Sequence, residues 1–92
     1  MSSAELRERL SSRWLNEIDE SQFPSSSMLN RTEATLQDRR SLETYVELLV
    51  EKVEASRFPS VDLLNRIDRL IGRLEQEERR ERAATARDSD DD

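Results

Sequence analysis

Apolar residues recur at every third or fourth position through most of the chain. In the first segment they fall at Leu6, Leu10, Trp14, Leu15 and Ile18. This spacing places them on one face of a helix and predicts an amphipathic helix from about Ser3 to Ser21. Ser2 and Glu5 stand three residues apart just before that face, which is the spacing of a helix-capping box.

The last apolar pattern is the most regular in the chain and comprises Leu63, Leu64, Ile67, Leu70, Ile71 and Leu74. It predicts a helix that begins after Ser60. The apolar pattern then stops, and the segment from Glu75 to Arg82 carries i,i+4 charge pairs such as Glu75 with Arg79. We therefore expect a solvated helical extension, and then a disordered tail at Asp88-Ser89-Asp90-Asp91-Asp92, which has no apolar group to bury.

The middle of the chain carries two apolar faces, formed by Met28, Leu29 and Leu36 and by Leu42, Val46, Leu49 and Val53. At about 100° per residue the second face is rotated by roughly a third of a turn from the first. A straight helix would not bury both against one neighbour. We expect a break between Asp38 and Ser41, and the alternative is one straight helix whose faces serve different neighbours, as in a dimer.

One motif occurs twice, 35 residues apart: Phe23-Pro24-Ser25 leads to Leu29-Asn30-Arg31, and Phe58-Pro59-Ser60 leads to Leu64-Asn65-Arg66. Seven identical pairs fall between Ser21 and Arg31 at that offset. In each copy the proline ends one helix and the serine caps the next. The phenylalanine and proline lie just outside that helix, where an apolar group can pack on the following leucine as a hydrophobic staple. We interpret the copies as a duplicated helix-turn-helix unit, over about 14–38 and 49–73.

These patterns predict an all-α fold, a small antiparallel bundle of three or four helices built on that duplicated unit. The bundle is expected to cover residues 1–76, with the charged extension and acidic tail in 77–92. The aromatic residues Trp14, Phe23, Tyr45 and Phe58 are expected to lie mostly in the core, because the chain has few other large side chains.

Composition narrows the classes of partner and compartment. The 21 acidic residues exceed the 15 basic ones, so the net charge of −6 disfavours nucleic acid and anionic membranes. Lys52 is the only lysine among mostly arginine cations, which favours a GC-rich bacterial source. There is no cysteine, no apolar run near the roughly 20 residues of a membrane span, and no secretion signal at the N-terminus. We expect a soluble, cytoplasmic protein.

The residue types that carry most catalysis are missing. The chain has no histidine, and its single glycine, Gly72, lies within a predicted helix, so no phosphate-binding loop is expected. Ser56 follows Lys52 by one turn, but Glu51 and Glu54 would keep that lysine protonated. We predict no catalytic residue, no metal site and no cofactor, and therefore no enzyme.

The helix-ending and helix-capping role of the repeated motif does not require the Asn-Arg pair at the end of each copy. Asn30, Arg31, Asn65 and Arg66 are the candidate ligand-binding residues, as a clamp for a carboxylate or phosphate. In the structural alternative, which we prefer, each asparagine satisfies backbone groups at its corner and each arginine pairs with an acid, such as Asp62 with Arg66.

The function that these observations favour is non-catalytic: a protein–protein interaction or accessory, regulatory protein. The interaction surface that we expect comprises Tyr45, Leu48, Val50 and Val61. The expected partner is a protein or a second copy of the chain, with a homodimer preferred. Two alternatives stay open. One is an anion-binding protein or all-α enzyme that uses Arg31 and Arg66, and the other is an acidic inhibitor of a basic partner, like an antitoxin or anti-sigma protein.

Overall fold

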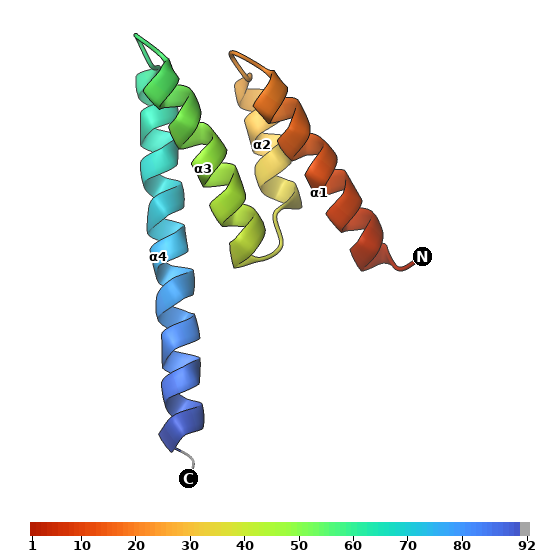
Figure 1. Ribbon diagram of the computed structural model, residues 1–92, viewed down its shortest axis with the longest axis vertical. Helices are drawn as coiled ribbons and strands as arrows, with labels where there is room; N and C mark the ends of the chain where they lie inside the picture. The colour runs from red at the N-terminus through yellow and green to blue at the C-terminus, as the bar shows by residue number, and fades with distance from the viewer. Residues whose placement is uncertain (91–92) are drawn as a thin grey trace.

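Four helices, packed side by side with alternating directions, make up the described part of the chain (Figure 1). A computed structural model describes residues 1–90, and the side chains of residues 1–85. The helices are α1 (Ser3–Glu20), α2 (Ser26–Thr35), α3 (Arg39–Ala55) and α4 (Val61–Asp90). The prediction of an all-α bundle is confirmed, with four helices in those residues.

Side-chain caps fix where the helices begin. Ser2 accepts from the backbone N–H of Glu5 at 3.2 Å, and Ser25 and Ser60 each accept at 3.1 Å from the N–H three residues later. Asp38 accepts from the N–H of Ser41 at 2.8 Å, and the Ser41 hydroxyl oxygen accepts in return from the N–H of Asp38. The N–H of Ser41, followed by its hydroxyl, holds the pKa of Asp38 below its usual value. The predicted break near Asp38 is therefore confirmed, and two helices occupy the middle of the chain.

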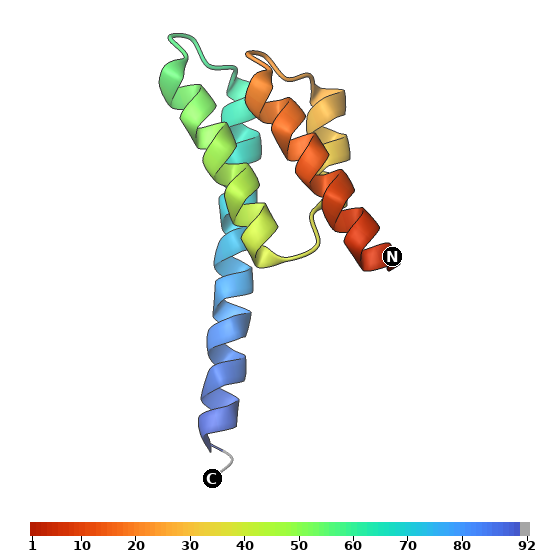
Figure 2. The same cartoon turned by 45° about the vertical axis from the view of Figure 1, so that its right-hand side comes forward.

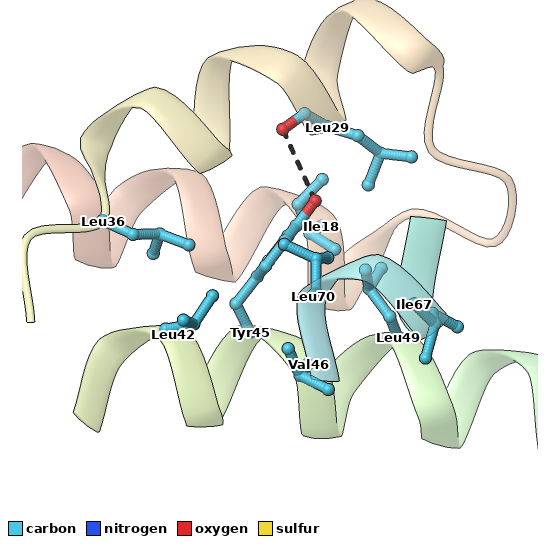
Figure 3. Packing of buried hydrophobic residues seen from close by; sticks show 9 residues of the cluster. All are labelled: Ile18, Leu29, Leu36, Leu42, Tyr45, Val46, Leu49, Ile67 and Leu70. Carbon is cyan, nitrogen blue, oxygen red and sulfur yellow. Dashed lines mark hydrogen bonds between the residues drawn. The ribbon is translucent and has the colours of Figure 1, made fainter. Parts of the chain in front are cut away.

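The core draws on all four helices and centres on Tyr45 of α3 (Figure 3). Its buried apolar members are Ile18, Leu29, Leu36, Leu42, Tyr45, Val46, Leu49, Ile67 and Leu70. Each such side chain contributes roughly 1.5–3 kcal/mol through its removal from water. Four of the six residues that pack around this cluster come from α3 and α4. Burial of these side chains is what holds the two helical hairpins, α1–α2 and α3–α4, against each other.

The first turns of α1 are less well covered than the sequence pattern suggests. Leu6 and Leu10 are about half exposed, whereas Ile18 near the other end is fully buried. The cause is length, because α1 has 18 residues and its hairpin partner α2 has only 10. The apolar face of α1 therefore extends past the end of α2.

The last helix continues beyond the bundle. Figures 1 and 2 show α4 projecting past the start of α3. Arg39, the first residue of α3, donates to Glu81 of α4 at 2.9 Å and also pairs with Glu43. The backbone stays helical to Asp90, including the first residues of the expected acidic tail. Asp91 and Asp92 of that tail lie outside the described residues.

Candidate interaction site at the corner end

Both Phe-Pro-Ser corners lie at the same end of the bundle, which we name the corner end (Figures 1 and 2). This follows from the alternating helix directions, since each hairpin turns at that end. The corners have similar backbone conformations: Ser21 after α1 has φ −86° and ψ 125°, and Ser56 after α3 has φ −91° and ψ 134°. Pro24 and Ser25 lie in the corner between α1 and α2, and Pro59 and Ser60 in the corner between α3 and α4.

A hollow of about 250 Å³ lies between the two corners. The phenylalanine and proline of each corner line it, and Leu29, Val53 and Leu63 add apolar side chains from three helices. An apolar cavity of roughly 150 Å³ is enough to admit benzene. The corner hollow therefore has room for one aromatic or large aliphatic side chain.

Phe23 and Phe58 are the most exposed aromatic side chains of the protein, at 80% and 88%. The expectation that they lie in the core or act as staples is wrong. Helix-capping geometry explains why. A staple is contributed by the residue just before the cap, and that residue is Pro24 or Pro59, each half-buried. Each phenylalanine stands one residue further out, so its ring is left in solvent beside the hollow.

Lys52 lines the hollow, but its ammonium group already forms hydrogen bonds within the protein. Its Nζ donates to the backbone carbonyls of Asp19 at 3.0 Å and Ser21 at 2.7 Å. These carbonyls lie at the C-terminal end of α1, which has no basic residue in its own last turn. A cation from α3 thus satisfies the negative end of the α1 dipole and links the two hairpins.

Arg66 also lines the hollow, and its guanidinium group likewise already has partners within the protein. Its guanidinium donates to Asn30 Oδ1 at 3.0 Å and pairs with Glu33. Glu33 accepts in addition from the Tyr45 hydroxyl at 2.7 Å, and that hydroxyl lies 3.4 Å from the carbonyl of Leu29. Burial, followed by the hydrogen bond to Glu33, raises the pKa of Tyr45 above its ordinary value. The network joins α2, α3 and α4.

The two copies of the Asn-Arg pair are therefore placed differently. Arg66 and Asn30, one residue from each copy, contact each other, and Arg66 pairs with Glu33 instead of the expected Asp62. Arg31 and Asn65 are exposed, and neither lines the hollow. Among the side chains of residues 1–85, neither of these two takes part in an ion pair or hydrogen bond. The structure does not gather the four residues into one clamp.

The interaction surface suggested by the sequence is not a continuous exposed patch. Tyr45 is fully buried in the core, and its hydroxyl is directed to Glu33 and the carbonyl of Leu29. Leu48 and Val50 are half-buried, and Val50 packs against the core. Only Val61, beside the second corner, is well exposed. Tyr45 is therefore corrected to a core residue.

Sequence reasoning missed Glu33, the acid at the centre of the network. Glu33 stands 33 residues before Arg66, and nothing local distinguishes it from the other acids. Lys52 carried a signal, since it is the only lysine in the chain. Its rarity marks Lys52 as unusual but does not predict which groups it contacts.

A second, more polar hollow lies between α1 and the start of α3. It measures about 460 Å³, and its lining includes Arg7 and Arg40 together with the acids Glu8 and Asp38. Ser11 also lines it, and the hydroxyl oxygen of this buried serine has no hydrogen-bond partner within the described part of the chain. Charges of both signs offset one another here, so this hollow shows no preference for a charged ligand.

Among the described residues, two kinds of functional feature were not found, a metal-binding cluster and a membrane-spanning helix. No three acidic side chains within residues 1–85 are grouped so that they can hold a metal ion. None of the helices, over the residues described, combines the length and apolarity needed to cross a membrane. No protein-family model matches the chain, and searches of curated proteins and of solved structures likewise found no match.

Proposed function

We propose that this chain is a non-catalytic interaction protein that binds its partner through the corner end. The observation that carries the proposal is the exposure of Phe23 and Phe58 at a hollow that both rings help to line. Leaving a phenylalanine in water forgoes roughly 1.5–3 kcal/mol of burial. Large aromatic side chains that fill pockets at the centre of an interface supply much of its binding energy.

The charges around the hollow favour an apolar occupant over an anion. Lys52 is bonded to two carbonyls of α1, and Arg66 is paired with Glu33. An anion would have to displace Glu33 from a guanidinium that is only 15% exposed. Breaking such a partly buried pair leaves an uncompensated charge, which is costly. The anion-binding and enzyme alternatives are for this reason the weaker ones, and no contact among the described residues favours the acidic-inhibitor alternative.

We also infer that the two hairpins descend from one duplicated unit. Support comes from the seven identities, from equivalent serine caps and from the similar backbone at Ser21 and Ser56. A chimera that gives the first corner the residues of the second tests the structural equivalence that a duplication requires. Its substitutions are Gln22→Arg, Ser26→Val, Ser27→Asp and Met28→Leu. The chimera should fold with unchanged helix content, and loss of folding would contradict equivalence of the corners.

Site-specific photo-crosslinking tests the proposed surface. The photoreactive amino acid p-benzoylphenylalanine replaces Phe58 in one variant and Phe23 in a second. It replaces Leu6 in a control variant, because Leu6 is an exposed apolar residue at the opposite end of α1. Irradiation of native cells that express each variant should yield protein adducts from positions 58 and 23, and few from position 6.

Two results would contradict the proposal. Adducts that form at position 6 but not at the corners would place the contact surface elsewhere. Absence of any protein adduct from the corner positions, in folded variants present at normal levels, would remove the interaction role of the corner end.

A further inference from the structure

We propose that the occupant of the corner hollow is Phe58 of a second copy of this chain, in a twofold-symmetric, end-to-end dimer. This inference rests on the proposed function and names its partner. The corner end carries both a projecting ring and a hollow that can receive one. A twofold axis places the same patch on both sides of an interface, so each copy gives a ring and receives one.

Size supports the match of ring and hollow. The hollow of about 250 Å³ exceeds the roughly 150 Å³ that accepts a benzene ring in an apolar cavity. Phe58 is the more exposed of the two corner rings, at 88%. Exposed corner residues line the hollow, so a side chain can enter it from outside.

The area available is that of a weak interface. The four corner phenylalanines of two copies would bury roughly 650 Å² between them, since each ring side chain offers about 150–250 Å². The surfaces that receive them add less than this, because the rings themselves form part of the walls of the hollow. The total stays below the roughly 1,200 Å² at which stable, specific interfaces begin, in the range of weak and transient ones. We therefore expect a weak dimer.

Charge distribution removes the main obstacle to self-association. Four of the six net negative charges belong to the last five residues, which leaves only −2 on the other 87. The α4 helix carries the chain away from the corner end as far as Asp90 (Figure 1). End-to-end docking therefore keeps the two acidic termini far apart, where salt screens exposed charges beyond about 10 Å. The projecting part of α4 also points away from the interface.

Sedimentation equilibrium over the micromolar range tests the dimer, with the full chain and two single variants. Phe58→Ser removes the projecting ring, and Leu6→Ser is the matched control at the other end of the bundle. The wild type and Leu6→Ser should show a dimer mass at high concentration. Phe58→Ser should weaken the dimer by a factor of roughly a thousand, because the substitution removes two rings per dimer and each contributes a factor of about 30. Far-UV circular dichroism checks that both variants fold.

A second test uses the absence of native cysteine, which makes any introduced thiol unique. Arg57→Cys places a thiol beside the corner ring, and Ala83→Cys places one on the projecting part of α4. Under mild oxidation, Arg57→Cys should form disulfide-linked dimers much faster than Ala83→Cys. Equal rates would contradict an end-to-end arrangement.

The outcomes separate this inference from the function on which it rests. A wild type that stays monomeric across the range overturns the second-copy proposal. If photo-crosslinks from position 58 then join other proteins, the interaction role stands with a different partner. A dimer that survives Phe58→Ser but is lost in Leu6→Ser also overturns the proposal and assigns the contact to α1.

Discussion

Removal of the Arg66 and Arg31 side chains is expected to have very different effects, although the two residues occupy equivalent positions in the repeated motif. Arg66→Ala removes the cation that joins α4 to α2 through Glu33 and Asn30. It leaves the Glu33 carboxylate, which is only 23% exposed, with the Tyr45 hydroxyl as its remaining partner. Arg31→Ala removes an exposed side chain that makes no hydrogen bond or ion pair with these groups.

The magnitude follows from the burial of the ion pair. Breaking a fully buried pair costs about 3–5 kcal/mol, whereas exposed pairs contribute about 0–1 kcal/mol. The Arg66 side chain is 15% exposed, which lies nearer the buried limit. We expect Arg66→Ala to lower the free energy of unfolding by about 2–3 kcal/mol, or roughly 10–20 °C in Tm for a domain of this size. Arg31→Ala should change stability by less than about 0.5 kcal/mol.

Urea unfolding measures both variants, with Trp14 fluorescence and far-UV circular dichroism as the signals. Trp14 is the only tryptophan, so its signal reports one half-buried position on α1. A double-mutant cycle with Glu33→Gln isolates the pair, and its coupling energy should exceed about 1 kcal/mol. Equal destabilisation by Arg66→Ala and Arg31→Ala, or a coupling energy near zero, would refute the structural role of the network.

Three further predictions concern single groups in the core and at helix ends. The raised pKa of Tyr45 means that its contribution to stability is complete below the unfolded value of about 10 and is lost as pH rises toward the folded value. Because Tyr45 is the only tyrosine, its ultraviolet titration should coincide with alkaline unfolding. Between neutral and alkaline pH, Tyr45→Phe should lose less of its free energy of unfolding than the wild type does. Ser11→Ala should raise the free energy of unfolding by about 1 kcal/mol in urea titrations, because it removes a buried hydroxyl unpaired within the described residues and favours the helix. Lys52→Met should lower it by about 1–2 kcal/mol, since the last carbonyls of α1 lose their cation.

The local features of this fold could be predicted from sequence because each depends on residues a few positions apart. Serine before an apolar pattern marked helix starts at Ser2, Ser25 and Ser60, and all three caps are present. The change of apolar face near Asp38 likewise predicted the break in the middle of the chain. Caps and periodicity are properties of a single helix, so no tertiary information was needed.

The site could not be predicted to the same extent, because it depends on how the two hairpins meet. The Arg66–Glu33 pair joins residues far apart in sequence, and many other acids were equally plausible partners. Exposure of Phe23 and Phe58 was missed because composition favours burying aromatic residues, whereas the geometry of the proline corner turns these two outward. The hollow between the corners exists only once both hairpins are placed side by side.

Fluorine NMR of the two corner rings tests the central claim most directly. Phe23 and Phe58 are the only phenylalanines, so incorporation of para-fluorophenylalanine yields two signals, and Phe23→Tyr assigns them. At low concentration both should show the solvent isotope shift of an exposed ring. As concentration rises through the micromolar range, the Phe58 signal should broaden and move, and its isotope shift should diminish as the ring becomes buried. A Phe58 ring that stays fully exposed at every concentration, and in extract of the native cells as well, would contradict a contact surface at the corner end.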